Sequence, residues 1–272
     1  MVSFVFRSLK IKKEGEEMDK KIFNDWHKYA QCYDVLNELY PYQNLQKTII
    51  RNLNLRSEDL ILDAGCGTGN LEWWALKLFG DIRIFKFIAI DYCLEMLLKA
   101  KRKLEGCNVY FLQADLNNRL PFKSNLFSKI VCVNTLYAVC SPPNTIREFY
   151  RVLKQNGKLI IVNPRPGYEN GLILKEHCGD TGPDEPWLGA HTSLKRDEEI
   201  IKRSINDRSV ASLLMNLAYF NKKILKNGKF WFLSSKELTK IVNKSKFLVI
   251  KEDKVYANQN IIIICKKEAT KC

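Results

Sequence analysis

Residues 60–70 read Leu-Ile-Leu-Asp-Ala-Gly-Cys-Gly-Thr-Gly-Asn, and this stretch decides the fold. An apolar run ends at Asp63, and glycines follow at every second position, at Gly65, Gly67 and Gly69. Glycines with this spacing let backbone N–H groups approach a ligand without a Cβ in the way, and the following helix presents its N-terminus at the same place. The stretch therefore predicts a strand that ends at a bound molecule.

The composition allows one large domain, or a domain with a substantial insertion. The chain has 272 residues, of which 46% are hydrophobic, enough to supply a full core. It has no run of 18 apolar residues, and residues 1–21 lack a signal-peptide pattern, so we expect no transmembrane segment and a cytoplasmic location. We expect residues 1–18 to be a leader, with Met18 as an alternative start, or a flexible tail, and residues 19–272 to form a single domain.

The cysteine spacing and the distribution of charge restrict the possible functions. The nine cysteines include no Cys-x-x-Cys pair, so the sequence predicts no metal site. The net charge of +14 is concentrated in residues 201–250, which hold 11 Lys and Arg against 2 Asp and Glu. This basic segment fits a solubilising helix surface, and it also fits an acidic partner such as a nucleic acid, a phosphorylated substrate or a membrane surface.

From residue 59 onward, short apolar runs alternate with helical patterns. The predicted strands are 59–63, 82–90, 109–113, 129–134 and 158–162, and the predicted helices between them are 71–79, 93–104 and 143–153. Continuous apolar strands separated by helices indicate a parallel sheet that is covered on both faces. The pattern therefore predicts a doubly wound, Rossmann-like α/β fold, whose ligands bind beyond the carboxyl ends of the strands.

The rest of the chain departs from this alternation. A capping box at residues 234–237 predicts a helix to about residue 243, and residues 247–250 and 260–265 predict an antiparallel hairpin. Residues 19–55 suggest helices that lead into the first strand. Residues 164–233 are too long for a simple connection, so we expect a lid or a substrate-recognition insertion, with a long helical stretch from about 195 to 225.

Acidic residues end the next two strands. A carboxylate at Asp91 can accept hydrogen bonds from both ribose hydroxyls, and one at Asp115 can accept from an adenine amine. The glycine pattern differs from the dinucleotide fingerprint, because Asn70 stands in place of a later glycine. No Gly-Lys-Ser/Thr follows, which excludes a phosphate-binding loop of the ATPase type.

Together these motifs closely resemble the class I S-adenosylmethionine-dependent methyltransferases, in particular the small-molecule group that includes the ubiquinone and menaquinone biosynthesis enzymes. The matching motifs are residues 62–69, 90–91, 114–115, 120–122 and 156–159. The resemblance covers about residues 24–163 and 234–266. It implies a seven-stranded sheet with an antiparallel last strand, S-adenosylmethionine as cofactor with S-adenosylhomocysteine as product, and a small-molecule acceptor.

The resemblance also implies a set of cofactor-binding residues. It assigns the methionine part to Gly65, Cys66, Gly67 and Gly69, which follow Asp63, the ribose to Asp91, the adenine faces to Tyr92 and Met96, the adenine edge to Ala114, Asp115 and Leu116, and the closure of the site to Asn134 and Tyr33. One residue departs from the family pattern. Ser128 stands where the family usually has Asp, so we expect the local packing there to differ.

The resemblance names no catalytic residue. A sulfonium makes the methyl group electrophilic, so the protein has to align the reactants and exclude water, which needs no catalytic triad. If the acceptor is a hydroxyl, a base must remove its proton. The candidate bases are His27, His177, His191 and Tyr137.

Three functions remain open at this stage. The first is a small-molecule methyltransferase in which residues 164–233 form the acceptor pocket; the apolar stretch 210–220 fits that pocket, packing on the sheet, or contact with a membrane surface. The second is a nucleic-acid methyltransferase, favoured by the basic segment. Against it, residues 134–137 lack the Asp/Asn-Pro-Pro-aromatic motif of amino-adenine enzymes, and Ser141-Pro142-Pro143-Asn144 is better interpreted as a helix start. The third is a non-catalytic cofactor-binding protein. The sequence does not indicate an oligomeric state.

Overall fold

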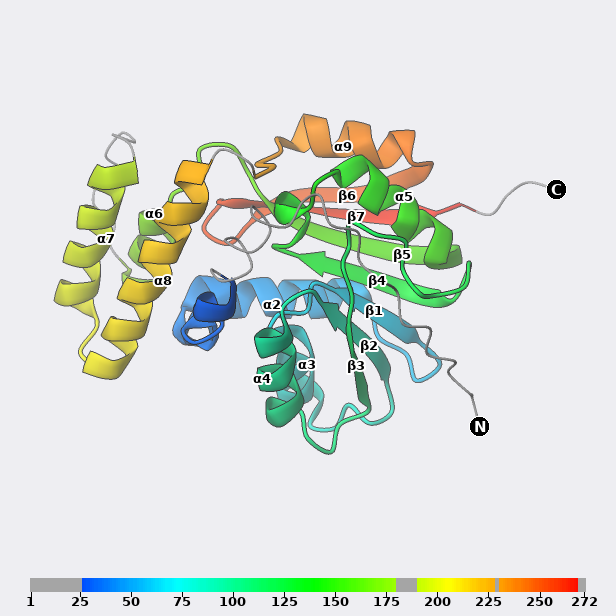
Figure 1. The fold of residues 1–272 in the computed structure, drawn as a ribbon, viewed down its shortest axis with the longest axis horizontal. Helices are drawn as coiled ribbons and strands as arrows, with labels where there is room; N and C mark the ends of the chain where they lie inside the picture. Colours follow the sequence, from blue (N-terminus) through cyan, green and yellow to red (C-terminus); the bar gives the residue numbers. More distant parts are fainter. Residues whose placement is uncertain (1–25, 180–189, 228–229, 269–272) are drawn as a thin grey trace, which may run out of the picture.

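The computed structural model describes residues 26–179, 190–227 and 230–268, and its centre is a seven-stranded sheet (Figure 1). The strands follow the order β3-β2-β1-β4-β5-β7-β6. Their bounds are β1 (Leu60–Ala64), β2 (Lys86–Asp91), β3 (Val109–Gln113), β4 (Phe127–Val133), β5 (Leu153–Pro164), β6 (Phe247–Val255) and β7 (Asn260–Lys267). The expected leader or tail, residues 1–18, lies outside the described residues.

The pairing of the strands confirms the predicted fold class. β1 pairs in parallel with β2 and β4, β2 with β3, and β4 with β5. β7 runs antiparallel to both β5 and β6. The chain order reverses between β1 and β4, so the carboxyl ends of these two strands flank the crevice in which ligands of doubly wound sheets bind.

Alternate residues of the central strands face two separate cores. Ile61 and Val131 pack with α2 (Tyr40–Leu53), α3 (Asn70–Phe79) and α4 (Leu94–Lys103), whereas Leu62 and Ile130 pack with α5 (Pro142–Val152) and α9 (Ser235–Lys244). Figure 1 shows these two groups of helices on opposite faces of the sheet. Both faces are buried, which explains why the strands are continuous apolar runs.

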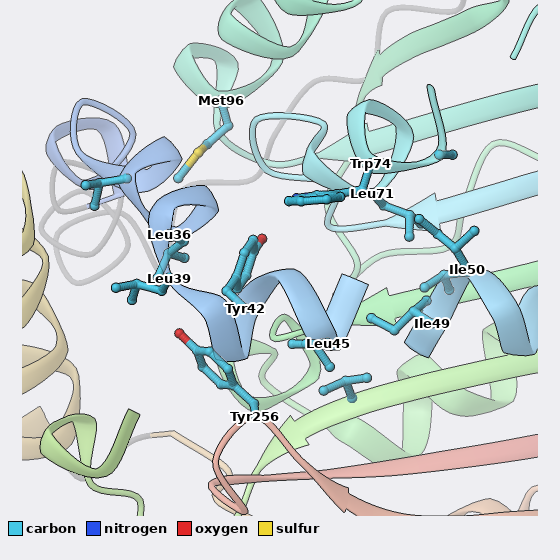
Figure 2. Close-up of a cluster of buried hydrophobic side chains, with 14 of the residues drawn as sticks. Leu36, Leu39, Tyr42, Leu45, Ile49, Ile50, Leu71, Trp74, Met96 and Tyr256 are labelled. Carbon is cyan, nitrogen blue, oxygen red and sulfur yellow. The ribbon is translucent and has the colours of Figure 1, made fainter. Parts of the chain in front are cut away.

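The core beside α2 extends to the edge of the sheet at which the parallel strands have their carboxyl ends. Leu39, Tyr42 and Leu45 are almost completely buried, and Tyr256, from the β6–β7 turn, packs edge-on against the Tyr42 ring at 5.9 Å between centroids (Figure 2). The 3-10 helix η1 (Tyr33–Glu38) precedes α2 and belongs to the same core through Leu36. This packing fixes the N-terminal segment next to the carboxyl ends of the strands.

The segment after β5 contains three helices rather than one long one. They are α6 (Asn170–Cys178), α7 (Ala190–Ser204) and α8 (Arg208–Asn227), and Figure 1 places them together at one end of the sheet. The helical stretch expected over 195–225 consists of α7 and α8, with a break between them. The cause is Asp207, whose carboxylate accepts from the backbone N–H of Ser209 at 2.8 Å and of Val210 at 3.1 Å, and so starts a new helix.

Two predicted strand boundaries also shift for local reasons. The second strand starts at Lys86 rather than Ile82, because residues 82–85 form a turn in which the N–H of Phe85 donates to the carbonyl of Ile82. The fifth strand starts earlier, at Leu153, because the chain leaves α5 directly in an extended conformation. The capping box is confirmed at Ser234 and Glu237, as is the helix start at Pro142.

Ser128 illustrates how the chain replaces the family's usual carboxylate. Its hydroxyl donates to the carboxylate of the buried Asp59 at 2.8 Å and accepts from the N–H of Leu60 at 3.1 Å, so it links β1 to β4. Lys129 forms a buried ion pair with the same carboxylate.

Within the three described ranges, no helix is both long and apolar enough to span a bilayer.

Candidate functional site

A cavity of about 410 Å³ opens at the carboxyl ends of β1, β2 and β4. Ten of the predicted cofactor residues line it: Tyr33, Gly65, Gly67, Asp91, Tyr92, Met96, Ala114, Asp115, Leu116 and Asn134. Three others, Asp63, Cys66 and Gly69, are not among the lining residues. The structure thus brings together residues spread over a hundred positions of sequence at the edge of the sheet that the strand pattern indicated.

The glycine loop is tied to β2 by its backbone. The N–H groups of Gly65 and Cys66 both donate to the carbonyl of Ile90, at 2.8 and 2.9 Å. Gly65 has φ +82°, and a Cβ added there would lie 2.2 Å from two atoms of the Thr135 side chain. The Thr135 hydroxyl in turn donates to the Gly65 carbonyl at 3.1 Å. Only glycine allows this approach of β4 to the loop.

The other two glycines of the loop have different neighbours. A Cβ added at Gly67 would lie 3.4 Å from the Tyr33 ring and 4.0 Å from the Met96 sulfur, so these two side chains lie directly beside Gly67. A Cβ at Gly69 would lie 2.8 Å from Leu104, so this glycine permits α4 to pack closely. Gly69 therefore acts through packing, outside the cavity.

Asp91 closes the loop from the end of β2. One carboxylate oxygen accepts from the N–H of Gly67 and the other from the N–H of Cys93, both at 2.8 Å. Burial raises the pKa of Asp91, and the N–H groups of Cys93 and Gly67 oppose that rise. A carboxylate has about four lone pairs, more than the N–H groups of Gly67, Cys93 and Tyr92 occupy, so Asp91 can still accept a hydrogen bond from a ligand in the cavity.

Asp115 follows β3, next to the end of β2, and is hydrogen-bonded within its own turn. Its carboxylate accepts from the backbone and side-chain N–H groups of Asn117, at 2.9 and 2.8 Å, and from the side chain of Asn118. Asn117 also lines the cavity and accepts from the N–H of Cys140 at 2.6 Å. Sequence reasoning missed Asn117, although an Asp followed by two Asn after a strand is a turn signal.

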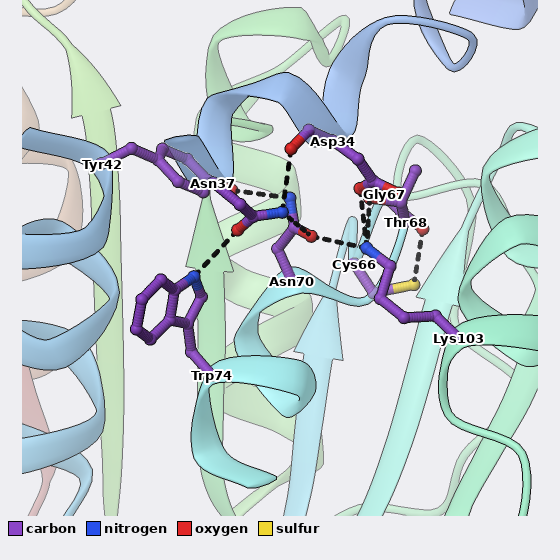
Figure 3. A network of polar contacts seen from close by, with 9 residues as sticks. All are labelled: Asp34, Asn37, Tyr42, Cys66, Gly67, Thr68, Asn70, Trp74 and Lys103. Atoms are coloured by element: carbon purple, nitrogen blue, oxygen red, sulfur yellow. Dashed lines mark hydrogen bonds and ion pairs between the residues drawn. The ribbon is translucent and has the colours of Figure 1, made fainter. Parts of the chain in front are cut away.

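A polar network holds the N-terminal segment over the loop (Figure 3). Asp34 accepts from the Thr68 hydroxyl at 2.5 Å and pairs with Lys103 of α4 at 2.6 Å. Lys103 also donates to Asn70 at 2.6 Å, and Asn37 donates to the same oxygen at 3.0 Å. We call Asp34, Thr68, Asn70, Lys103 and Asn37 the clamp. Because Asp34 follows Tyr33, the clamp holds the Tyr33 ring above Gly67.

Two of the predicted residues that lie off the cavity are buried below the loop. Asp63 is 2% exposed and lies beside Glu72 of α3, which is fully buried. Burial raises the pKa of Glu72 to about 7, and burial together with the nearby Glu72 carboxylate raises that of Asp63 well above its ordinary value. The Cys66 thiol is also buried, which raises its pKa and leaves it a poor nucleophile.

The remaining walls of the cavity are aromatic. They are formed by Trp26, Tyr29, Tyr137, Tyr168, Phe230, Phe232 and Tyr256, together with Asn221, Ile224 and Leu225 of α8. The rings pack against one another; for example, Tyr137 contacts Phe230 at 5.5 Å and Trp26 at 6.4 Å between centroids. We call this part the aromatic half of the cavity. No sequence motif marks it, because its residues come from five separate segments of the chain.

Of the candidate bases whose side chains the structure describes, His27 and His177 lie away from the cavity and Tyr137 lines it. His27 pairs with Glu95 at 2.6 Å, and His177 accepts from the N–H of Tyr40 at 3.1 Å; neither lines the cavity. The side chain of His191 lies outside the described residues. Tyr137 does line the cavity, but burial raises its pKa, so it is a neutral phenol at physiological pH.

The packing of Gly65 against Thr135 predicts the effect of Gly65→Ala. A non-glycine residue at positive φ costs about 1–2 kcal/mol, and overpacking adds about 1–3 kcal/mol. We therefore expect thermal unfolding to show a free energy of unfolding lower by about 2–5 kcal/mol for Gly65→Ala. Gly80→Ala is the matched control, because Gly80 also has positive φ but has open space around its Cβ position. Equal losses for both variants would contradict the packing argument.

The Asp63–Glu72 pair predicts how stability depends on pH. The pKa of Glu72 is raised from 4.5 to about 7, so between these values the folded state binds more protons than the unfolded state. The contribution of this pair to the free energy of unfolding therefore falls as the pH rises from about 5 to 8. We expect Glu72→Gln to be less sensitive to pH over this range and relatively more stable than wild type at pH 8. Parallel pH profiles of the two melting temperatures would contradict this.

Comparisons with known proteins identify similar sequences and similar folds. The sequence profile of the methyltransferase domain family matches residues 61–157. The ubiquinone/menaquinone biosynthesis C-methyltransferase UbiE of Francisella philomiragia is 30% identical over 154 residues, which cover 54% of this chain and 60% of that protein. The chain thus matches about 60% of the length of this curated relative.

Solved structures show the same fold at low sequence identity. A chain in the complex between the Haloferax volcanii Trm112 methyltransferase activator and a methyltransferase has a TM-score of 0.59 at 13% identity, covering 91% of this chain and 98% of that one. Geranyl diphosphate C-methyltransferase from Streptomyces coelicolor, solved with S-adenosylhomocysteine, has a TM-score of 0.53 at 12% identity, covering 82% and 77%. Residues 61–157 therefore match the methyltransferase domain family, and the chain has the fold seen in these solved methyltransferase structures.

Proposed function

We propose that the protein transfers a methyl group from S-adenosylmethionine to an uncharged small molecule. The observation that carries this proposal is the division of one cavity into two parts. The predicted cofactor residues line one part, and the aromatic half forms the other. A methyl donor and an acceptor bound side by side in one cavity can react directly, because the reaction needs alignment of acceptor, methyl and sulfur.

The residues present fit the cofactor. Gly65 and Gly67 line the cavity without a side chain, so the backbone there can lie against the methionine part. Asp91 has free lone pairs for ribose hydroxyls, and Tyr92 and Met96 supply apolar surfaces for adenine. When bound, S-adenosylmethionine supplies a methyl group made electrophilic by its sulfonium.

The chain's own residues orient the reactants and exclude water. The clamp holds Tyr33 over the glycine loop, and the ring contacts of Trp26 and Tyr137 close the aromatic half. We also assign α8 and its neighbours in residues 164–233 the role of acceptor wall, because Asn221, Ile224 and Leu225 line the cavity. No histidine of the described residues lines the cavity, which favours an acceptor atom that attacks without a dedicated base.

The charges around the cavity favour a neutral acceptor over a nucleic acid. Despite the net charge of +14, no Lys or Arg of the described residues lines the cavity, and its charged lining residues are Asp91 and Asp115. Nucleic acids and diphosphates are bound mainly through positive charges at their phosphates. The basic residues of α8, such as Lys223 and Lys226, are exposed instead. They fit the interpretation of a solubilising surface.

Substitution of Asp91 tests the proposal. A hydrogen bond to a charged group contributes about 1.5–3 kcal/mol, so we expect Asp91→Asn to weaken S-adenosylhomocysteine binding roughly tenfold or more in isothermal titration. With labelled S-adenosylmethionine and a set of neutral and anionic acceptors, we expect transfer to a neutral acceptor by wild type and not by Asp91→Ala.

Asp253→Asn is the control for the loss of one acidic charge, since Asp253 is exposed on β6. We expect it to bind S-adenosylhomocysteine as wild type does. Failure of the wild-type protein to bind either form of the cofactor would refute the proposed function. Transfer only to RNA or to phosphorylated molecules would refute the neutral acceptor.

A further inference from the structure

Among the apolar side chains of the aromatic half, two polar side chains are hydrogen-bonded to each other. The hydroxyl of Tyr29 donates to the side-chain oxygen of Asn221 at 2.8 Å, and both residues line the cavity. Around this pair, the Tyr29 ring packs against Trp26 and Phe220 at 5.6 Å each. An amide is costly in such surroundings unless it is hydrogen-bonded, so the position of Asn221 needs an explanation.

Buried residues behind the cavity hold Asn221 in place. Its amide N–H donates to Asn170 of α6 at 3.1 Å, and the amide of Asn170 donates to Asp197 of α7 at 3.2 Å. Asp197 is 2% exposed, and burial raises its pKa to about 7. The chain of bonds therefore runs from the cavity through α8 and α6 to a buried acid in α7.

Close packing fixes the far end of this chain of bonds. Arg196, next to Asp197, forms an ion pair with Glu169 at 2.5 Å. A Cβ added at Gly171 would lie 2.9 Å from Asp197 and 3.0 Å from Arg196, so α6 can approach α7 only with glycine there. Because the supporting residues are packed and bonded, the Asn221 amide cannot easily turn away from the cavity.

The pair keeps capacity for one more partner. Tyr29 uses its proton on Asn221, and its oxygen can still accept a hydrogen bond. Asn221 uses one of its two amide protons on Asn170 and can donate the other. A group that both donates and accepts, such as a hydroxyl, matches these two free functions. No Lys or Arg of the described residues lines the cavity, so the site does not suit an anionic group.

We propose that Tyr29 and Asn221 form the polar anchor of the acceptor site, and that the acceptor is a neutral, ring-containing apolar molecule with a hydroxyl group that this pair binds. This inference rests on the proposed function, because it assigns the aromatic half to the acceptor. Asp197 and Asn170 are positioning residues that act through Asn221.

Fluorine NMR with two small probes tests the anchor. The probes are 4-fluorophenol and 4-fluorotoluene, which differ in the hydroxyl, titrated into protein saturated with S-adenosylhomocysteine. A neutral hydrogen bond contributes about 0.5–1.5 kcal/mol net, so we expect Tyr29→Phe to weaken fluorophenol binding roughly fivefold and to change fluorotoluene binding less than about twofold. Asn221→Leu is a second variant with the same expected selectivity. Tyr219→Phe is the matched control, because Tyr219 lies on α8 with its side chain exposed.

The outcomes separate the anchor from the proposed function. Selective loss of fluorophenol binding in Tyr29→Phe, with S-adenosylhomocysteine affinity unchanged, supports the anchor. Equal changes for both probes, no change for either, or no binding of either probe to wild type would overturn it while leaving cofactor binding intact. Failure of the wild-type protein to bind S-adenosylhomocysteine would instead refute the function on which the inference rests.

Discussion

The hydrogen bond from the Gly67 N–H to the Asp91 carboxylate joins the two elements on which the site depends. It connects the turn after β1 to the end of β2, and the neighbouring N–H groups of Gly65 and Cys66 add two bonds to the Ile90 carbonyl. Positive φ at all three glycines of the loop allows the chain to make this turn before α3 begins. With the loop fixed, Asp91 and the backbone of Gly65 and Gly67 face the same cavity.

The other parts of the site are arranged around that loop. The clamp attaches the N-terminal segment to the loop and to α4, and thereby places Tyr33 above Gly67. Thr135 approaches from β4 and fits only because residue 65 has no Cβ. Asn221, Ile224 and Leu225 of α8 join aromatic side chains from other segments to form the aromatic half, beside the part that we assign to the cofactor. One rigid turn thus determines where donor and acceptor would meet.

The sequence predicted the sheet and much of the cavity because both depend on local patterns. Apolar strands that end in Asp63, Asp91 and Asp115 predict acids at one edge of a parallel sheet, and the structure places two of these acids at the cavity. Asp63 instead lies beneath the loop beside Glu72, because its position in the strand alternation points it into the protein. A motif shows that a residue is close to a ligand site, and only packing shows which way it faces.

The rest of the site depends on contacts between distant segments, which one sequence does not reveal. Tyr29 meets Asn221 across 192 positions of the chain, and Asp34 meets Lys103 across 69. Asp is a typical N-cap residue, so Asp207 marks the break between α7 and α8. The apolar periodicity continues on both sides of Asp207, and the sequence pattern therefore did not indicate the break. The three-helix arrangement that brings Asn221 to the cavity follows from that break.

A crystal structure with S-adenosylhomocysteine tests most directly the claim that one cavity holds donor and acceptor. The account predicts ribose hydroxyls within hydrogen-bond distance of the Asp91 carboxylate, and the sulfur directed toward the aromatic half. A ligand bound outside this cavity, or bound in it with the sulfur directed away from Tyr29 and Tyr137, would contradict the account.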